Sequence, residues 1–394
     1  MRPFEGIKVI DATHVLAGPF AAYQLAVLGA DVIKVEDPNE CDQSRYHGSA
    51  EELNRTRMGT GYLAQGSNKR CITLNLKTET GREILRKLAG TADVFVENYR
   101  AGSFRALKLG YEDMKKRNPR LIYCSMTAFG QDEPRGTQTA YDHAIQAISG
   151  IMASTGTPET APMKCGSPIV DYSTGIVAAF AISSALFQRE RTGRGQYIDC
   201  SMLDTALMLQ ASHITNYFAT GKPASLKGNQ HVYAAGNLYD TKEGRVMLAA
   251  SSERQNVRLM KAVGLDAFAG RSNDERKQHF AEETRALSEI MKEKTAQEWE
   301  DYLQSRHVPA ARLRSLEEVL DDRQLKGREI LHHHEEVPGV DGPVTVPMCA
   351  FKYEHHGPSI ETPPPRMGEH NDLVLKSLGY SELDIQAFRR LGII

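Results

Sequence analysis

Residues 7–36 read IKVIDATHVLAGPFAAYQLAVLGADVIKVE. Short runs rich in β-branched residues, Ile7–Asp11 and Asp31–Glu36, flank a segment of helical pattern at residues 20–28. Gly29 follows that segment directly, and glycine is a common residue at the end of a helix. This order predicts a strand–helix–strand unit whose two strands are parallel.

The same alternation continues toward the C-terminus. Strand-like and helical runs follow one another at Cys71–Leu76, Glu79–Leu88, Asp93–Glu97, Leu121–Met126, Asp171–Phe187 and Gln196–Ser201. Short strands separated by helices are typical of a mostly parallel sheet that is covered on both faces. The predicted fold class is therefore α/β, with a Rossmann-like parallel sheet in the N-terminal region.

With 394 residues, the chain exceeds the size at which one core usually stops growing, so more than one domain is expected. The pattern changes near residue 221 to short strands, turns and charged helices, and a proline-rich tail ends in two short helices. We predict a large Rossmann-like domain at residues 1–220 and a smaller α+β domain at 221–325. A C-terminal tail at 326–394 is expected to return to the large domain.

The composition narrows the possible functions. Hydrophobic residues make up 41% of the chain and charged residues 25%, both ordinary for a globular protein. A net charge of -2 lacks the basic excess that nucleic-acid binding needs. The six cysteines are far apart without a C-x-x-C pair, and the N-terminus has no signal pattern. We therefore expect a cytoplasmic protein with no nucleic-acid or membrane partner.

The loop after the first strand argues against a dinucleotide. Residues 11–19 read DATHVLAGP, in which Gly18 stands alone, so the G-x-G-x-x-G motif of Rossmann dinucleotide enzymes is missing. Glu36, at the end of the second strand, resembles the ribose-binding acid of NAD enzymes, but that role depends on the missing glycines. An NAD-dependent oxidoreductase is therefore a poor second interpretation.

The sequence contains neither a metal-binding motif nor the motif of a serine hydrolase. The consecutive histidines His332–His334 would point in different directions on a helix or a strand, so a solvated run is the simpler interpretation. The thirteen histidines form no H-E-x-x-H motif, and the chain has no G-x-S-x-G elbow. We predict no metal site.

Asp171 is the first candidate for catalysis. It stands in GSPIVDYSTG at residues 166–175, where a helical pattern begins. One interpretation is a helix N-cap, a position that aspartate favours. The other is a nucleophile, because a carboxylate ionised at pH 7 can attack a thioester carbonyl without a separate general base. Sequence position alone leaves both open.

Basic residues border two of the predicted strands. Lys69, Arg70 and Lys77 border the third strand and are either solvated strand ends or ligands of phosphate groups. Arg105 and Lys108 follow the fourth strand, beyond its carboxyl end, which is where ligands bind in open α/β sheets. Their position makes these two residues candidates for anion binding.

Ten sets of short segments carry a resemblance that spans nearly the whole chain. They are residues 6–11 with 17–19, 28–36, 68–70 with 74–77, 96–100 with 102, 118–122, 129–131, 141 with 146–147 and 149–150, 171 with 175, 189 with 192–195, and 368–370 with 378–380. In these segments the chain resembles the class III CoA-transferases. That family includes formyl-CoA transferase and carnitine CoA-transferase, and the α-methylacyl-CoA racemases are its relatives.

The resemblance implies a chemistry for Asp171. In such enzymes the matching aspartate attacks an acyl-CoA to give a mixed anhydride and then an aspartyl-CoA thioester, and the acceptor acid repeats these steps in reverse. Coenzyme A and acyl-CoA would then be substrates, with no permanently bound cofactor. The resemblance also implies a CoA-binding large domain and a homodimer of two interlocked chains.

Family positions for coenzyme A carry over onto eight residues of this sequence, which are Val15, Leu16, Ala17, Leu74, Lys77, Asn98, Tyr99 and Lys108. Tyr141 matches a tyrosine that lies near the reacting centre in the family. Arg105 is added to these candidates from its place in the topology alone.

Three positions depart from the formyl-CoA transferases. Leu16 stands where those enzymes have a glutamine, and Asp37 and Thr139 stand where they have basic residues. The glycine-rich loop that covers their nucleophile is not evident between residues 221 and 300. We therefore expect neither oxalate as the acid substrate nor a polar side-chain contact from position 16.

The racemases offer an alternative function. They move a proton with a histidine and an aspartate in a Gly-His-Asp-x-Asn-Tyr segment, and the corresponding residues here, 140–145, read AYDHAI. Tyr141 replaces the histidine, and His143 is out of register. The sequence therefore favours a transferase over a racemase-like epimerase. A non-catalytic CoA-binding protein is a third possibility, against which the presence of Asp171 argues.

Overall fold

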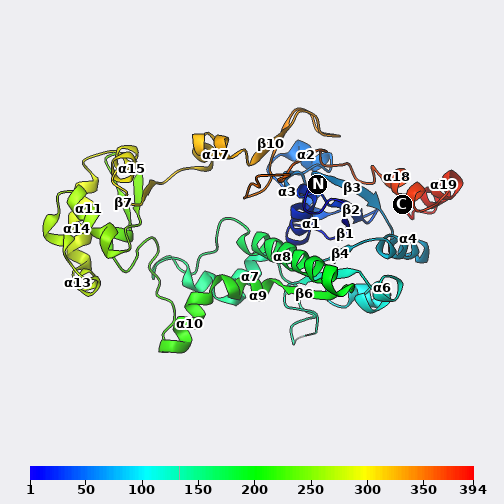
Figure 1. Cartoon of the computed structure of the whole chain (residues 1–394), viewed down its shortest axis with the longest axis horizontal. Coiled ribbons are helices and arrows are strands. Elements are labelled where there is room, and N and C mark those ends of the chain that lie inside the picture. Colours follow the sequence, from blue (N-terminus) through cyan, green and yellow to red (C-terminus); the bar gives the residue numbers. More distant parts are fainter. Residues whose placement is uncertain (133) are drawn as a thin grey trace. The chain divides into compact units, whose positions relative to one another are not determined.

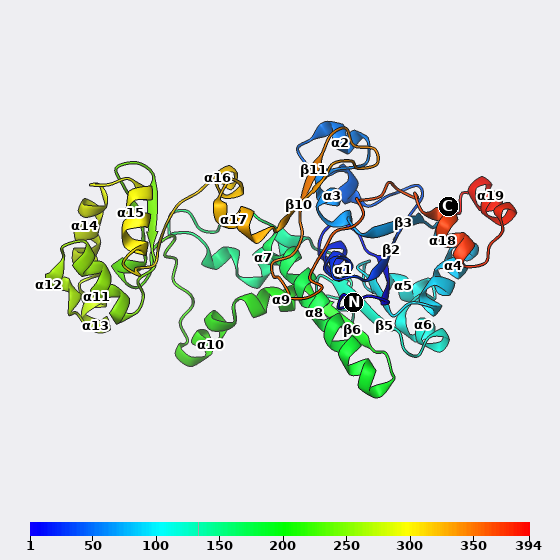
Figure 2. The ribbon, with the colours of Figure 1, turned by 45° about the horizontal axis from the view of Figure 1, so that its top comes forward.

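The computed structural model describes residues 1–132 and 134–394, and the chain divides into two compact units (Figures 1 and 2). The larger unit comprises Met1–Ile151, Lys164–Gly221 and Glu329–Ile394, and the smaller unit comprises Met152–Met163 and Lys222–Arg328. Residues 152–163, which the predicted boundaries assign to the first domain, group with the smaller unit.

The larger unit contains a six-stranded parallel sheet in the order β3-β2-β1-β4-β5-β6. Its strands are β1 Lys8–Ala12, β2 Asp31–Glu36, β3 Lys69–Thr73, β4 Val94–Glu97, β5 Ile122–Thr127 and β6 Tyr197–Ser201. The strand order reverses between β1 and β4, so a crevice opens at their carboxyl ends. The sheet confirms the predicted α/β class and its Rossmann-like topology.

Each face of the sheet carries its own hydrophobic core, because successive side chains of a strand point to opposite faces. Val9 of β1 packs with α1 (Ala17–Val27) and α8 (Ile169–Thr192), whereas Ile10 packs with α4 (Glu79–Gly90) on the other face. The C-terminal helices α18 (Asn371–Ser377) and α19 (Glu382–Arg390) add Val374, Leu375 and Ile385 to the core that contains Ile10. Residues from both ends of the chain thus share one core.

The remaining elements of the larger unit are short. They are η1 Gln43–Tyr46, α2 Glu51–Arg55, α3 Thr60–Gly66, α5 Ser103–Ala106, α6 Tyr111–Arg117, α7 Asp142–Ser149, α9 Met202–Leu209, α10 Ala211–Thr220, β10 Leu331–His334 and β11 Val344–Pro347. Two separate helices follow β6, because α9 ends and α10 begins on either side of Gln210. There the Gln210 side chain donates a hydrogen bond to the carbonyl oxygen of Ser149 at 2.9 Å.

The smaller unit is α+β in composition. Its elements are η2 Met152–Ser154, η3 Ala234–Gly236, β7 Leu238–Asp240, β8 Arg245–Leu248, α11 Glu253–Ala262, α12 Asp266–Ala269, α13 Asn273–Gln278, α14 Phe280–Met291, α15 Ala296–Gln304, β9 Ala310–Arg312, α16 Leu316–Leu320 and α17 Arg323–Arg328. Its three strands form an antiparallel sheet, and Leu259, Leu287 and Trp299 pack in a core of their own.

Helix α8 is long and apolar enough to cross a membrane by length and composition. Its residues Ala178 and Ile182 are fully buried in the core beneath the sheet, as in the core helix of a globular unit. Gly175 marks the point where α8 crosses α1, because a Cβ atom there would lie 2.8 Å from the carbonyl oxygen of Ala17. This close crossing brings the first turn of α8 next to the loop that precedes α1.

Candidate active site

The loop between β1 and α1 lies at the carboxyl edge of the sheet and has an unusual backbone. Val15 has φ of +69°, a left-handed conformation that a β-branched residue rarely adopts. Its N–H donates to Oδ1 of Asp42 at 2.9 Å, and its carbonyl oxygen accepts from Nε2 of Gln65 at 2.6 Å. Two buried polar side chains therefore hold this loop in shape.

Buried ion pairs lie beneath that loop. Lys34 pairs with Asp42 at 2.8 Å, and Lys69 pairs with Asp11 at 2.8 Å. Burial opposes ionisation of Asp42, but the attraction of Lys34 outweighs it and lowers the pKa of Asp42 to about 2. Lys69 is therefore neither a solvated strand end nor a phosphate ligand, and both interpretations of this residue are wrong.

Two more charged residues of this edge are already paired. Glu36 receives hydrogen bonds from the guanidinium of buried Arg45, including one from Nε at 2.8 Å. Arg70 pairs with Asp31 at the other end of the sheet, where β2 and β3 begin. Because its carboxylate is occupied by Arg45, Glu36 is not free to bind a ribose, which agrees with the missing glycine motif.

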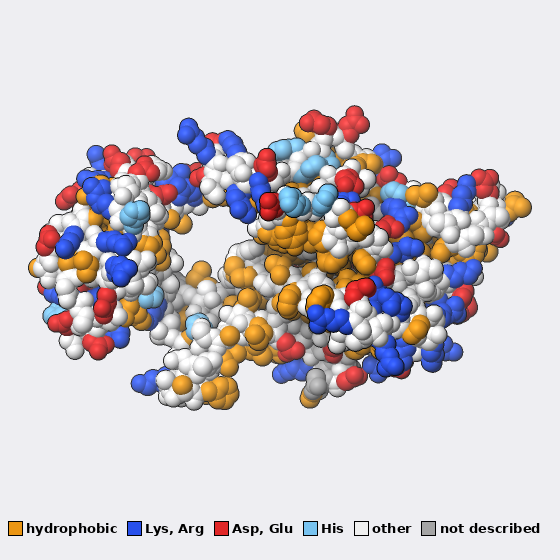
Figure 3. All heavy atoms as spheres, viewed as in Figure 1, with side chains coloured by type: hydrophobic (Ala, Val, Ile, Leu, Met, Phe, Trp, Pro, Cys, Tyr) orange, Lys and Arg blue, Asp and Glu red, His pale blue; other side chains and the backbone are white. Residues whose placement is uncertain are grey.

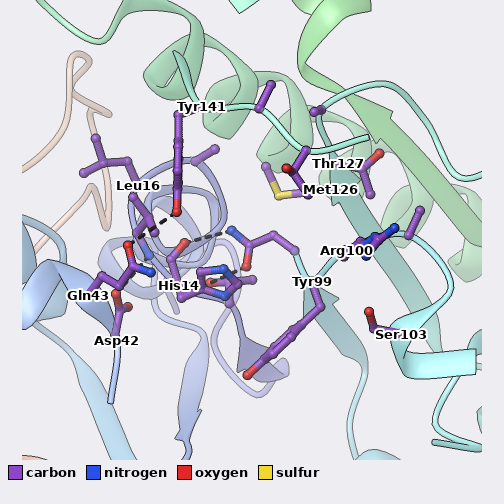
Figure 4. A pocket seen from close by; sticks show the side chains of 18 of the residues that line it. His14, Leu16, Asp42, Gln43, Tyr99, Arg100, Ser103, Met126, Thr127 and Tyr141 are labelled. Carbon is purple, nitrogen blue, oxygen red and sulfur yellow. Dashed lines mark hydrogen bonds between the residues drawn. The ribbon is translucent and has the colours of Figure 1, made fainter. Parts of the chain in front are cut away.

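The loop after β4 is fastened to the first loop by a pair of reciprocal hydrogen bonds. The N–H of His14 donates to Oδ1 of Asn98 at 2.9 Å, and Nδ2 of Asn98 donates to the carbonyl oxygen of His14 at 2.8 Å. The rings of His14 and Tyr99 meet edge to face with centroids 5.0 Å apart. Figure 4 shows His14 and Tyr99 among the residues that line a cavity, with Tyr141 across from them.

That cavity has a volume of about 620 Å³ and runs along the carboxyl ends of β1, β2 and β4. Eight of the residues proposed from the sequence line it, namely Val15, Leu16, Ala17, Lys77, Asn98, Tyr99, Tyr141 and Asp171. Sequence reasoning missed Gln43 and Arg100, which also line it. Arg100 stands beside Asn98 and Tyr99 in the sequence, so its place after a parallel strand could have identified it.

Three of the residues proposed from the sequence do not line this cavity. Leu74 follows the end of β3 and is only 1% exposed, in the hydrophobic core that also contains Ile72. Arg105 is exposed and pairs with Asp132 at 3.1 Å, and Lys108 is exposed after the short helix α5. Position beyond a strand is therefore too coarse a guide, because α5 carries these two side chains away from the cavity wall.

Asp171 is the third residue of α8, and Pro168 rather than Asp171 occupies the N-cap position. Oδ2 of Asp142, from the start of α7, accepts hydrogen bonds from the N–H groups of Val170 at 2.7 Å and Asp171 at 3.0 Å. Asp142 thus satisfies two free N–H groups of the first turn, which is the role expected of an N-cap side chain. The N-cap interpretation of Asp171 is wrong, and its side chain instead faces the cavity.

The environment of Asp171 favours the protonated acid. The residue is 8% exposed, and burial, together with the charge of Asp142, raises the pKa of Asp171 to about 7. The expectation of a fully ionised carboxylate at pH 7 is therefore wrong, because about half of the molecules would hold the proton. A pKa near the working pH is typical of groups that take part in catalysis.

A second cavity, of about 450 Å³, adjoins the first. Five residues line both cavities, namely Val15, Leu16, Gln43, Tyr141 and Asp171. The hydroxyl of Tyr141 donates to Oε1 of Gln43 at 3.4 Å across this junction (Figure 4). Asp171 is therefore accessible from two sides.

The three consecutive histidines do not form a metal site. Residues 1–132 and 134–394 contain no group of three His, Cys, Asp or Glu side chains placed to hold an ion. The histidine run forms β10, in which His334 is buried and its Nε2 lies 2.9 Å from Oγ of Ser67. His333 instead bonds to Thr345 of β11. The expectation of a fully solvated run is wrong for His334.

Comparisons with known proteins agree with this geometry. The sequence matches the model of CoA-transferase family III over residues 4–371. It is 34% identical over 402 residues to succinyl-CoA:glutarate CoA-transferase of Mus musculus, which covers 100% of this chain and 91% of that protein. It is also 34% identical over 389 residues to succinate–glutarate CoA-transferase of Agrobacterium fabrum, covering 95% of this chain and 96% of that protein.

A solved structure has the same fold along its whole length. The crystal structure of a CAIB/BAIF family protein from Brucella suis matches with a TM-score of 0.83 and 32% sequence identity, covering 96% of this chain and 99% of that chain. The resemblance seen in ten sets of short segments is thus confirmed, and with it the assignment as a transferase that acts on acyl-CoA. The chain belongs to CoA-transferase family III.

Proposed function

We propose that this enzyme moves coenzyme A from an acyl-CoA donor to a carboxylic acid through covalent intermediates on Asp171. The observation that supports this most directly is the position of the Asp171 carboxylate, which faces the junction of two cavities. A nucleophile at such a junction can receive a thioester from one side and an acid from the other.

The proposed reaction has four acyl-transfer steps, none of which consumes or releases water. The Asp171 carboxylate attacks the donor thioester and releases CoA thiolate, which leaves a mixed anhydride. The thiolate then attacks the Asp171 carbonyl of the anhydride, so the donor acid leaves and an aspartyl-CoA thioester remains. The acceptor carboxylate displaces the thiolate to form a new anhydride. The thiolate attacks the acceptor carbonyl, which forms the product acyl-CoA and restores Asp171.

The N-terminus of α1 offers a means to stabilise the developing oxyanion. Leu16 and Ala17, where this helix begins, line the same cavity as Asp171. N–H groups in the first turn of a helix have no intrahelical partner and can donate to a nearby oxyanion. Backbone donors would thus replace the polar side chain that is missing at position 16.

The first cavity would hold coenzyme A. Among its basic residues, Lys77 and Arg100 stand after β3 and β4, where the phosphates of a ligand lying across the strand ends would pass. Glu36, Asp37, Glu40 and Asp42 also line this cavity, and Arg45 and Lys34 neutralise Glu36 and Asp42. These two ion pairs reduce the negative charge that a bound phosphate would meet in this cavity.

We also propose that the enzyme is an interlocked homodimer, as its family resemblance implies. Large apolar side chains on α8 and α10 face solvent in the single chain, including Phe180 at 72% and Phe218 at 84% exposure. Figure 3 shows hydrophobic side chains gathered over these helices. An exposed apolar surface of this kind usually marks a protein interface.

The nucleophile can be tested by covalent trapping. Wild-type enzyme and the variant Asp171→Ala are incubated with succinyl-CoA and a series of carboxylic acids, with mass detection of the acyl-CoA products and of an Asp171 hydroxamate after hydroxylamine treatment. We expect Asp171→Ala to lose transfer by roughly 10³-fold or more and to give no hydroxamate.

Asp266→Ala is the matched control, because Asp266 is an exposed aspartate in the first turn of another helix. It should transfer coenzyme A as the wild type does. Undiminished transfer by Asp171→Ala would refute the nucleophile. Exchange of the α proton in heavy water without any acid acceptor would instead indicate the racemase chemistry.

A further inference from the structure

The second cavity lies on the side of Asp171 that the proposed coenzyme A position leaves open. The residues that line only the second cavity come from α7, from residues 164–168, which lead into α8, and from His47. The first cavity is lined instead by the loops after β1, β2 and β4. An acid that reacts at Asp171 while coenzyme A occupies the first cavity must therefore extend into the second.

The charged side chains of the second cavity differ in how free they are to bind a ligand. Its acidic residues are Asp171, the nucleophile, and Asp142. Asp142 is already engaged, since one of its oxygens accepts two backbone N–H groups and the other accepts from Nε2 of Gln146. The basic residues are His47, His143 and Lys164.

Lys164 is the permanent cation of this set, and its side chain is exposed to the cavity. Within residues 1–132 and 134–394, its ammonium group makes no hydrogen bond or ion pair. Lys77 and Arg100 line the first cavity rather than the second, and Lys34, beneath the first loop, is already paired with Asp42. Lys164 is thus a cation that lines the same cavity as the nucleophile and has no ion-pair partner in the part of the chain that the structure describes.

We propose that the second cavity is the acid subsite and that it takes a dicarboxylic acid, whose distal carboxylate pairs with Lys164 while the other carboxylate reacts at Asp171. This inference rests on the proposed transferase function. The distal carboxylate takes no part in the two steps that follow binding of the acceptor acid and keeps its charge, so Lys164 can hold the acid in place through both. His47 and His143 border the same space and offer further hydrogen-bond donors.

The walls of the cavity suit a short hydrocarbon spacer between the two carboxylates. Val15, Leu16 and Pro168 line it with apolar atoms, so methylene groups can lie between Asp171 and Lys164 without burying a polar group. A monocarboxylic acid of the same length would fill the same space but would leave Lys164 without a partner. The site should therefore discriminate by the distal charge more than by length.

The test compares glutarate with pentanoate, two acids of equal carbon number that differ in the distal carboxylate. The specificity constant kcat/KM of each acid is measured with succinyl-CoA as donor, because in a ping-pong reaction the constant for the acceptor does not depend on the donor. The variants are Lys164→Met, which removes the charge, and Lys164→Arg, which keeps it. Lys116→Met, an exposed lysine of α6, is the control.

We expect wild type and Lys116→Met to prefer glutarate over pentanoate by roughly tenfold or more. Lys164→Met should lower kcat/KM for glutarate by roughly 10- to 100-fold, mainly through KM, as expected for a lost hydrogen bond between charged groups. It should leave pentanoate nearly unchanged, and Lys164→Arg should retain most of the preference.

Equal use of the two acids by the wild type, or an equal loss for both acids in Lys164→Met, would overturn the inference. So would a wild type that forms the Asp171 hydroxamate from succinyl-CoA yet accepts neither acid. A wild type that forms no hydroxamate and transfers to no acid would instead refute the proposed function itself. The two failures are therefore separable in one set of reactions.

Discussion

Oδ2 of Asp142 accepts the backbone N–H of Asp171 at 3.0 Å, and the same carboxylate adds its charge to the environment of the Asp171 side chain. One residue thus fixes the start of α8 and disfavours ionisation of the nucleophile that this helix carries. Asp142 comes from α7, 29 positions earlier in the sequence. Its contact with α8 therefore couples the position of Asp171 to its proton affinity.

Asp142→Asn should move the pH dependence of the first acyl transfer. The amide oxygen of asparagine can still accept the two N–H groups, whereas the negative charge is removed. Burial is the larger cause of the raised pKa of Asp171 and remains, so the midpoint should fall from about 7 by on the order of one pH unit without reaching 3.8. Single-turnover formation of the hydroxylamine-sensitive adduct between pH 4 and 9 measures this midpoint. An unchanged midpoint would show that the Asp142 charge has no effect.

Asp171→Asn should change stability in a pH-dependent way. The pKa of Asp171 is about 7 in the folded chain and 3.8 without the protein environment, so the folded state holds this proton more tightly. The resulting stabilisation is complete below pH 3.8 and is lost as the pH rises through 7. At pH 8 the variant should therefore exceed the wild type in free energy of unfolding, by up to about 4 kcal/mol. At pH 4 the two proteins should differ little.

This prediction is checked by denaturant unfolding at both pH values. The single tryptophan, Trp299, lies in the smaller unit, so far-UV circular dichroism is the better probe for the unit that contains Asp171. A variant that is more stable by the same amount at pH 4 and pH 8 would contradict the pKa argument, because an uncharged packing effect does not depend on pH.

The sheet could be predicted from the sequence because its signals are local. Runs such as Asp31–Glu36 combine β-branched residues with glycine or polar neighbours, and that run is β2 with the same bounds. Asn98 and Tyr99 are predicted from the family resemblance, and they line the cavity just beyond the carboxyl end of β4, where ligands bind in open α/β sheets.

The electrostatics of the site could not be predicted in this way. Lys69 and Asp11 are 58 positions apart in the chain and pair only because β3 and β1 share a sheet. The cap from Asp142 to Asp171 is equally non-local. Neither pair leaves a spacing pattern in the sequence, so Lys69 was expected at the surface or at a phosphate, and Asp171 was expected to be ionised.

The buried pair of Lys34 and Asp42 should contribute far more to stability than the exposed pair of Arg70 and Asp31. Asp42→Ala removes the partner of the buried Lys34 ammonium group, which keeps only its hydrogen bond to the Thr13 carbonyl oxygen and weaker attraction from Asp11 and Glu36. This change should lower the free energy of unfolding at pH 7 by about 3 kcal/mol. Asp31→Ala, whose side chain is 45% exposed, is the matched control and should cost less than about 1 kcal/mol. Denaturant unfolding followed by circular dichroism compares them. Equal losses would mean that the buried pair is not specially stabilising.

The Asp42 contribution should also depend on pH in the opposite sense to that of Asp171. Lys34 holds the pKa of Asp42 near 2, below the ordinary value of 3.8, so the folded state releases this proton more readily. The stabilisation is present above pH 3.8 and is lost as the pH falls toward 2. The difference between wild type and Asp42→Ala should therefore shrink on acidification, whereas a pH-independent difference would contradict the assigned ion pair.

Val15 gives the last prediction, which separates backbone strain from side-chain contacts. Its φ of +69° places a β-branched residue in the left-handed region, where a Cβ atom costs about 1–2 kcal/mol. Val15→Ala and Val15→Gly both remove the side chain from the cavity, but only glycine removes the Cβ clash. Val15→Gly should therefore be more stable than Val15→Ala by about 1 kcal/mol in denaturant unfolding, because alanine is penalised at positive φ. Both should raise KM for succinyl-CoA to a similar extent, since they lose the same contact surface. A less stable glycine variant would mean that the hydrogen bonds of the Val15 backbone with Asp42 and Gln65 do not hold this residue in the left-handed conformation.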